Sequence, residues 1–364
     1  MTRDFQRLMG EAARLMRGGQ LSEATAAIQQ ALGGSPAPAP APAPVPDTPA
    51  PARPQDDDVI DVEARVVGAP TPAPAPAPSS SSAGETFKAG HYRNEIGARD
   101  YKLFEPARDG RPLPLVVMLH GCTQDPDDFA RGTRMNALAR AQGALVLYPA
   151  QSQRANAQRC WNWFKHNHQA RGKGEPAILA GMVRDVMARH DVDPDRVYVA
   201  GLSAGGAMAA ILGDAYPDVF AAVGVHSGLA TGSARDVQSA FAAMAGGPVA
   251  PSRRGARQGP TPPTIVFQGD ADPTVNVVNG ERVIAAAGLT PRPASERGAS
   301  AGGVAYTRRA WVDGQGADRG ELWTLHGVAH AWSGGDLAGS YTDPRGPDAS
   351  AEMLRFFLRH PRRS

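Results

Sequence analysis

A strand–turn–helix pattern around Ser203 constrains the fold of this chain more than any other segment. Residues 196–200 are apolar and β-branched, which predicts a strand, and residues 207–212 have helical character. Between them lies the sequence GLSAGG at residues 201–206. A turn of the G-x-S-x-G type lifts a serine hydroxyl above the end of a sheet, and its glycines avoid collisions with the neighbouring strand and helix. The pattern predicts that Ser203 is a nucleophile.

Strand-like apolar runs alternate with helical patterns from about residue 86 to the C-terminus. This alternation predicts the α/β class, with a mostly parallel sheet covered by helices on both faces. Functional sites in such sheets form beyond the carboxyl ends of the strands. We expect strands at residues 114–119, 144–148, 196–200, 221–225, 264–268, 305–312 and 322–325, and helices at residues 127–142, 176–190, 204–215 and 348–359.

Three regions follow one another along the chain. Residues 1–33 carry apolar side chains at helical spacing in two pieces, which predicts a helical hairpin that docks or oligomerises, or alternatively anchors the chain to a polymer surface. Residues 34–85 are rich in Pro, Ala and Ser and predict a disordered linker without a core. Residues 86–364 are expected to form the catalytic domain, with residues 231–262 as a small cap near its entrance.

Composition excludes several classes of protein. The net charge of +2 gives no reason to expect a nucleic-acid partner. Apolar runs fall short of the roughly 18 residues that a membrane span needs. The N-terminus has no continuous apolar stretch typical of a secretory signal peptide, which keeps a cytoplasmic location as an alternative. Neither a phosphate-binding glycine loop nor a set of metal ligands is recognisable, so no cofactor and no metal are expected.

A serine nucleophile needs an imidazole to take its proton and a carboxylate to orient that imidazole. Asp270 and Asp272 follow the strand expected at residues 264–268, and we predict Asp272 as the orienting acid, with Asp270 bonding the local backbone of its turn. The alternative is that both are turn residues. His330 is predicted as the base, whereas His326 is expected to be packed or bonded to the backbone.

Two backbone amides are expected to bind the oxyanion that forms during attack on a carbonyl carbon. The amide of Ala204 follows the nucleophile directly. The amide of Cys122, in the loop after the strand expected at residues 114–119, is the second candidate. The alternative for this loop is an ordinary turn at a strand end.

Four ordered motifs resemble the polyhydroxybutyrate (PHB) depolymerase family of esterases, which also contains feruloyl and acetylxylan esterases. They are LHGCTQ at residues 119–124, CWNWF at 160–164, GLSAGG at 201–206 and HAWSGG at 330–335. The similarity spans residues 86–360 and implies an α/β-hydrolase fold with Ser203, Asp272 and His330 as the catalytic triad. It also implies an extracellular location, with a cytoplasmic location as the alternative.

The resemblance carries further implications. It implies a disulfide between Cys122 and Cys160, which the residues alone leave open. It also makes Trp161, Trp163 and Trp332 candidates for the substrate cleft, with buried packing as the alternative. The chain departs from the family in having Ser333 where proline is common, and Gln268 where many hydrolases have histidine. A separate substrate-binding domain is also not visible, which puts activity on crystalline polymer in doubt.

The function expected from these features is that of a serine esterase. It would hydrolyse hydroxyalkanoate oligomers or short-chain or aromatic esters through an acyl-enzyme. The alternatives are a feruloyl or acetylxylan esterase of the same family and a serine peptidase of the same fold. The alternative outside enzymes is a binding or adaptor protein with an inert hydrolase fold.

Overall fold

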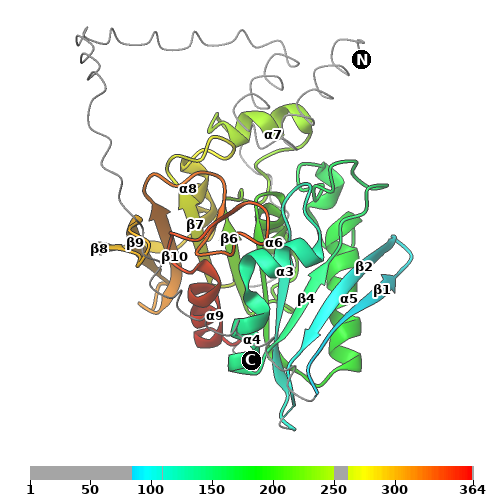
Figure 1. The fold of residues 1–364 in the computed structure, drawn as a ribbon. Helices are drawn as coiled ribbons and strands as arrows, with labels where there is room; N and C mark the ends of the chain where they lie inside the picture. The colour runs from blue at the N-terminus through cyan, green and yellow to red at the C-terminus, as the bar shows by residue number, and fades with distance from the viewer. Residues whose placement is uncertain (1–83, 109, 250–260, 363–364) are drawn as a thin grey trace, which may run out of the picture. The chain divides into compact units, whose positions relative to one another are not determined.

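One long sheet organises the part of the chain that the structure describes (Figure 1). The structure is a computed structural model and describes residues 84–108, 110–249 and 261–362. The hairpin predicted at residues 1–33 and residues 34–83 of the predicted linker lie outside the described residues. The strands of the sheet are β1 (Thr86–Arg93), β2 (Ala98–Glu105), β3 (Leu113–Leu119), β4 (Leu145–Pro149), β5 (Val192–Leu202), β6 (Ala222–His226), β7 (Thr264–Gly269), β8 (Thr290–Ala299), β9 (Ala305–Val312) and β10 (Asp318–Leu325).

The strand order is β1-β2-β4-β3-β5-β6-β7-β10-β9-β8. Strands β4, β3, β5, β6, β7 and β10 are parallel to their neighbours within this group. Antiparallel strands complete both edges, β1 and β2 on one side and β9 and β8 on the other. The prediction of a mostly parallel sheet is therefore confirmed, and the carboxyl ends of its central strands meet at one edge.

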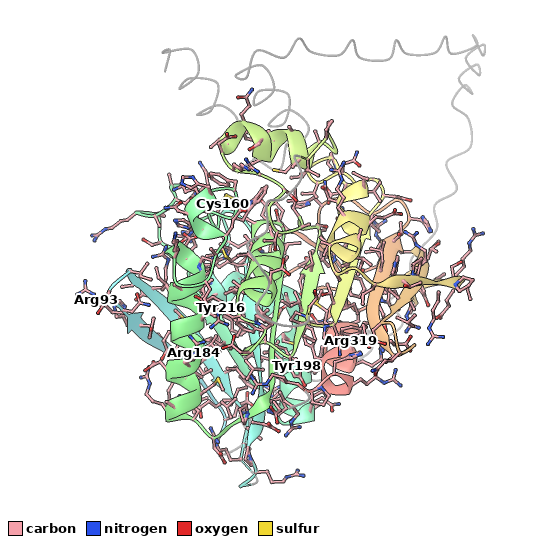
Figure 2. All side chains as sticks on the ribbon, turned by 180° about the vertical axis from the view of Figure 1, so that it is seen from behind. Arg93, Cys160, Arg184, Tyr198, Tyr216 and Arg319 are labelled. Carbon is pink, nitrogen blue, oxygen red and sulfur yellow. A yellow bond between two sulfur atoms is a disulfide. The ribbon has the colours of Figure 1, made fainter. Side chains whose placement is uncertain are left out.

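Helices cover both faces of the sheet. Figure 1 shows α3, α4 and α9 on one face, and Figure 2, from behind, shows α5 and α6 on the other. Arg184 of α5 lies 5.5 Å from the ring centre of Tyr216, which follows α6 (Figure 2). The helices are α3 (Pro126–Thr133), α4 (Met135–Gln142), α5 (Gly174–Arg189), α6 (Ala204–Ala215), α7 (Val237–Met244), α8 (Val278–Ala285) and α9 (Ala349–Arg359), with a 3-10 turn, η1 (His166–His168), and a short strand pair, β11 (Trp332–Ser333) and β12 (Thr342–Asp343).

Two apolar cores result from the alternation of side chains along the buried strands. Val117 and Val199 belong to the core that packs against α5 and α6. Val116 and Tyr198 belong to the core beneath α9, where the Tyr198 ring stacks on Phe357 at a centroid distance of 5.0 Å. Because both faces are covered, the strands read as continuous apolar runs.

Some elements differ from the sequence-based prediction. The single helix expected at residues 127–142 is two helices, because Arg134 adopts a left-handed conformation with φ of 53°. The β1–β2 hairpin, β8 and α8 are not among the elements that the sequence predicts, whereas α7 lies within residues 231–262, the stretch expected as a cap. Strand β8 is exposed along nearly its whole length and, among the strands that the structure describes, pairs only with β9, so it carries no buried apolar pattern to detect. Within the described ranges, no helix is long and apolar enough to cross a bilayer.

Candidate active site

Ser203 stands in a strained turn between β5 and α6. Its backbone has φ of 56° and ψ of −118°, a region that residues with side chains rarely adopt. The flanking glycines are required by close backbone approach: a Cβ on Gly205 would overlap the carbonyl oxygen of Leu119, and one on Gly201 would overlap the backbone of Gly205. These contacts explain the G-x-S-x-G spacing in physical terms.

Asp272 and His330 are joined directly by a hydrogen bond. Nδ1 of His330 lies 2.7 Å from Oδ2 of Asp272, and both side chains are buried. An ionised carboxylate only accepts hydrogen bonds, so Nδ1 carries the proton and Nε2 is left free to accept one. Asp272 follows β7 and His330 follows β10, and these two strands are parallel neighbours in the sheet.

Local hydrogen bonds hold the Asp272 carboxylate in place. Its Oδ1 accepts the backbone N–H groups of Thr274 and Val275, each at 2.8 Å, and its Oδ2 also accepts from Nε2 of Gln268 at 3.2 Å. Burial by itself would raise the pKa of Asp272, but His330 and the two amides outweigh it, and the pKa is lowered. The group therefore remains an anion. Gln268, noted in the sequence only as a departure from histidine, is one of its partners.

His226 connects the segments of Ser203 and His330, and sequence reasoning missed it. Its carbonyl oxygen accepts the N–H of Ser203 at 2.9 Å, and its Nε2 accepts the N–H of Ser333 at 3.0 Å. Burial is the largest cause that lowers the pKa of His226, and the nearby His330 lowers it further, to about 3. The ring is therefore neutral at ordinary pH. His226 is the last residue of β6, so it lies where the carboxyl ends of the parallel strands meet. This position is the signal by which the sequence could have indicated a role in the site.

Ser203 is not bonded to His330 in this structure. Within the described part of the chain, Oγ of Ser203 makes no hydrogen bond to the imidazole. The N–H of Ser203 is held by the carbonyl group of His226, and the His226 ring accepts the N–H of Ser333, three residues after His330. Hydrogen bonds between catalytic groups often tighten only when a substrate binds.

The two amides predicted to bind an oxyanion are free to donate. Neither the N–H of Cys122 nor that of Ala204 has a protein acceptor among the described residues. The N–H of Ala204 opens α6, where the first amides of a helix have no partner within it. The adjacent Gly121 amide, in contrast, is occupied by Oε1 of Gln124 at 2.9 Å.

Cys122 and Cys160 form a disulfide that ties the Cys122 loop to the segment at residues 160–164. The N–H of Thr123 also donates to the carbonyl oxygen of Gln158 at 2.7 Å. Figure 2 places Cys160 at the end of the sheet opposite Arg319, the second residue of β10, and therefore at the end where the central strands terminate. The crosslink braces the loop that carries the Cys122 amide.

The three tryptophans proposed for a substrate cleft are buried. Trp161 is fully buried, and its Nε1 donates to the carbonyl oxygen of His120 at 3.1 Å. Trp332 donates from Nε1 to Oγ of Ser350 at 3.0 Å, and Trp163 is buried in the same core as Trp161. The structure thus favours the packing alternative for all three over direct contact with a ligand.

The expectations for Asp270 and His326 need correction. The Asp270 carboxylate reaches across to the loop after β10: its Oδ2 lies 2.8 Å from Nδ1 of His326, and its Oδ1 accepts the N–H of Gly327 at 2.7 Å. His326 is neither packed nor bonded to the backbone through its ring, which is exposed and whose Nε2 lies 2.9 Å from Oγ1 of Thr307. A second, exposed Asp–His pair therefore stands beside the buried one.

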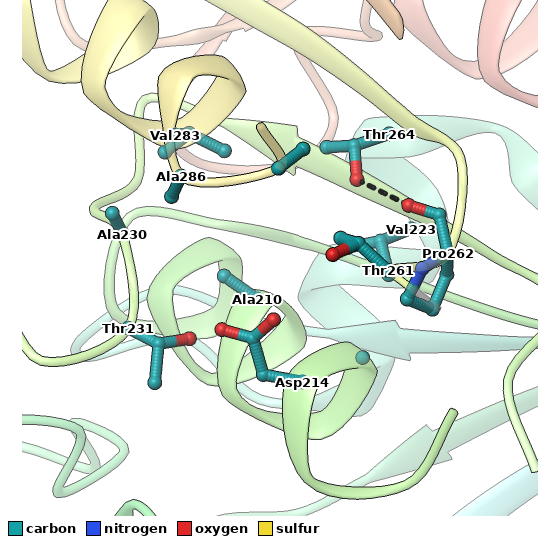
Figure 3. Close-up of a pocket in the computed structure, with 12 residues that line it drawn as sticks. Ala210, Asp214, Val223, Ala230, Thr231, Thr261, Pro262, Thr264, Val283 and Ala286 are labelled. Carbon is teal, nitrogen blue, oxygen red and sulfur yellow. Dashed lines mark hydrogen bonds between the residues drawn. The ribbon is translucent and has the colours of Figure 1, made fainter. Parts of the chain in front are cut away.

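A small pocket between α6 and α8 lies away from these residues (Figure 3). Its lining includes Ala210, Val223 and Val283, together with Thr231, whose buried Oγ1 has no hydrogen-bond partner. None of the predicted catalytic residues lines it. Within the described ranges, no three His, Cys, Asp or Glu side chains converge as metal ligands.

The sheet order and the residues gathered at its carboxyl edge define an α/β-hydrolase. A family model described as Esterase PHB depolymerase matches residues 100–288. The chain belongs to this family.

Curated relatives agree with the family assignment. A poly(3-hydroxyalkanoate) depolymerase C of Paucimonas lemoignei is 34% identical over 194 residues, covering 50% of this chain and 47% of the relative. A poly(3-hydroxybutyrate) depolymerase of Ralstonia pickettii is 30% identical over 249 residues, covering 64% and 50%. A feruloyl esterase B of Thermothelomyces thermophilus is 34% identical over 128 residues, covering 35% and 43%. The chain spans about half the length, or less, of these relatives.

A solved structure shows the same fold. An acetyl xylan esterase from Aspergillus awamori superposes with a TM-score of 0.55 at 20% sequence identity, covering 64% of this chain and 89% of that one. At this identity the likeness concerns the fold alone.

Proposed function

We propose that this chain is a serine esterase that acts through an acyl-enzyme. One observation carries the proposal: the buried Asp272–His330 pair, joined at 2.7 Å, lies at the same edge of the sheet as the strained turn that presents Ser203. A hydroxyl raised on such a turn, an imidazole with a free Nε2 and a buried carboxylate are the three groups that nucleophilic catalysis by serine requires.

In the proposed first step, Nε2 of His330 accepts the proton of the Ser203 hydroxyl as its oxygen attacks the ester carbonyl carbon. Asp272 keeps the imidazole in the tautomer with its proton on Nδ1 and stabilises the imidazolium that forms. The amides of Ala204 and Cys122 donate to the oxyanion, and each such donor contributes about 3–4 kcal/mol to transition-state stabilisation.

The tetrahedral intermediate then collapses. The bond from the carbonyl carbon to the alcohol oxygen breaks, and His330 returns its proton to the departing alcohol. Water, deprotonated by the same Nε2, attacks the acyl-enzyme and releases the acid, and the proton returns to Ser203. No cofactor takes part in this sequence.

For the substrate we propose esters of hydroxyalkanoate oligomers or of short-chain or aromatic acids. The names of the relatives, depolymerases of hydroxyalkanoate polyesters and feruloyl esterases, support this range. A peptidase of the same fold is the competing enzyme, and an inert binding protein is the competing class.

The decisive experiment measures hydrolysis by the purified chain across a panel of esters. The panel contains p-nitrophenyl butyrate, hydroxybutyrate oligomers, PHB film, methyl ferulate and acetylated xylan, with a peptide anilide as the peptidase arm. We expect ester turnover that Ser203→Ala lowers by several orders of magnitude. Turnover of the anilide alone would favour the peptidase, and failure of a fluorophosphonate to label Ser203 would favour the inert scaffold.

We further propose that the chain works outside the cytoplasm. The Cys122–Cys160 disulfide supports this location, because disulfides persist in oxidising compartments and are rare in the cytosol. Thiol alkylation of the chain isolated from its native cell tests the proposal: protected cysteines in a secreted fraction support it, and alkylated cysteines in a cytosolic fraction contradict it.

A further inference from the structure

Two Asp–His pairs join the same two loops side by side. The inner pair is Asp272–His330, and the outer pair is Asp270–His326. The acids are two residues apart in the loop after β7, and the histidines are four residues apart in the loop after β10. The proposed mechanism uses only the inner pair.

The outer pair is built with more contacts than a chance ion pair at the surface. Asp270 uses both carboxylate oxygens across the loops, accepting from Nδ1 of His326 at 2.8 Å and from the N–H of Gly327 at 2.7 Å. The other ring nitrogen of His326 lies 2.9 Å from Oγ1 of Thr307 on β9. Because a carboxylate only accepts, Nδ1 of His326 carries a proton, and a neutral ring accepts from the Thr307 hydroxyl.

The backbone between the two pairs is closely packed. The N–H of Asp270 donates to the carbonyl oxygen of Leu325 at 3.0 Å. A Cβ on Gly269 would overlap the carbonyl oxygen of Val328, midway between the two histidines. A displacement of His326 or Asp270 is therefore transmitted through few bonds to the loop that carries His330.

We infer that the Asp270–His326 pair, braced by Thr307, is a positioning device that holds the loops of Asp272 and His330 at the separation their hydrogen bond requires. This inference rests on the proposed role of Asp272 and His330. The outer residues touch no reacting atom, so they act through the inner pair. A misplacement of about 1 Å at a catalytic group can lower a rate by about 100-fold, which is the scale at which such a device matters.

The exposure of the outer pair makes it testable without unfolding the protein. The side chains of His326 and Asp270 are 42% and 37% exposed, so their removal leaves no core cavity. The chain also offers a matched control, the exposed pair His91–Asp100, whose Nδ1 and Oδ1 atoms lie 2.6 Å apart. This pair lies on the β1–β2 hairpin, which four strands separate from β7 in the sheet order.

The experiment compares Asp270→Ala, His326→Ala and His91→Ala in the full chain. We expect both outer-pair variants to lower kcat for p-nitrophenyl butyrate about 10- to 100-fold, with KM changed less than about threefold, and His91→Ala to match the wild type. His326→Asn, whose amide N–H can reach the position of Nδ1–H, should recover most of the lost rate.

A spectroscopic readout separates this inference from the proposed function. The downfield proton resonance of the His330–Asp272 hydrogen bond should be present in the wild type and in His91→Ala, and be weakened or lost in both outer-pair variants, with no ester present. An unchanged resonance in those variants, or a kcat within twofold of the wild type, overturns the inference. Undiminished ester turnover by Ser203→Ala overturns the proposed function instead, and leaves the resonance result to decide on the positioning device.

Discussion

Asp272 and His330 are 58 residues apart in the sequence, yet the Oδ2 atom of one lies 2.7 Å from the Nδ1 atom of the other. The contact exists because β7 and β10 are neighbouring parallel strands, although β8 and β9 separate them along the chain. Parallel pairing places the loops that follow both strands at the same edge of the sheet. The carboxylate thereby meets the imidazole away from bulk water, where their interaction is strong.

Replacing Asp272 by Asn should abolish most of the activity without unfolding the chain. The amide places an N–H where the carboxylate accepted a proton, so His330 changes tautomer and loses its free Nε2. We expect kcat to fall by about 10⁴, as for the equivalent change in other triads. Steady-state kinetics measures this, with the exposed Asp100→Asn as the control. A loss of less than about tenfold would contradict the role of Asp272.

Gly205→Ala should destabilise the fold strongly. The new Cβ would overlap the carbonyl oxygen of Leu119, and neither backbone can move without displacing β3 or α6. We expect the free energy of unfolding to fall by about 3 kcal/mol or more. Gly314→Ala is the control, because a Cβ there meets no atom within 4 Å, and its effect should stay within about 0.5 kcal/mol. Urea unfolding compares the two, and equal midpoints would refute the packing argument.

Removing the Cys122–Cys160 disulfide should affect both stability and rate. The bridge closes a loop with a sequence separation of 38, for which the chain-entropy model gives about 4 kcal/mol. The Cys122→Ala/Cys160→Ala variant keeps the Cys122 amide but frees its loop, so we expect a lower kcat as well. Denaturant titration and ester kinetics test this. Unchanged kcat in the folded double variant would show that the crosslink does not hold the oxyanion loop.

Trp161→Phe should lower stability and leave substrate affinity unchanged. The indole is fully buried and its N–H is bonded to the carbonyl oxygen of His120, so the change costs about 1–3 kcal/mol. Leu337→Ala, at a side chain that is 75% exposed, should change stability little. Unfolding and KM are measured together. A KM raised tenfold at unchanged stability would return Trp161 to the substrate cleft.

Stability should fall as the pH drops from 6.5 to 4.5. Burial is the main cause that lowers the pKa of His226 to about 3 and that of His120 to about 4, so both stay neutral in the folded chain while they bind protons in the unfolded chain. The unfolded state then holds more protons, and stability present above pH 6.5 is lost on acidification, by about 2 kcal/mol for each histidine. Urea unfolding midpoints across this pH window measure the loss of stability. The control variant His91→Ala should lose the same amount of stability as the wild type. A stability that does not change with pH would contradict the prediction.

Much of the parallel core and the Ser203 turn could be predicted from the sequence, because buried strands and close-packed glycines leave local patterns. Helix α6 and strand β9 have the bounds that the sequence indicates. The break at Arg134 and the edge strand β8 left no such pattern, since one depends on a single backbone conformation and the other on pairing with β9 alone.

The sequence by itself determined the class of fold, the family and the chemical types gathered in the site, because hydrophobic periodicity and the glycine–serine turn are local properties. Only the tertiary structure decided that Asp270 pairs with His326, that His226 is bonded to both Ser203 and Ser333, and that Trp161, Trp163 and Trp332 are packed. These outcomes depend on strand order and burial, which bring together residues far apart in the chain.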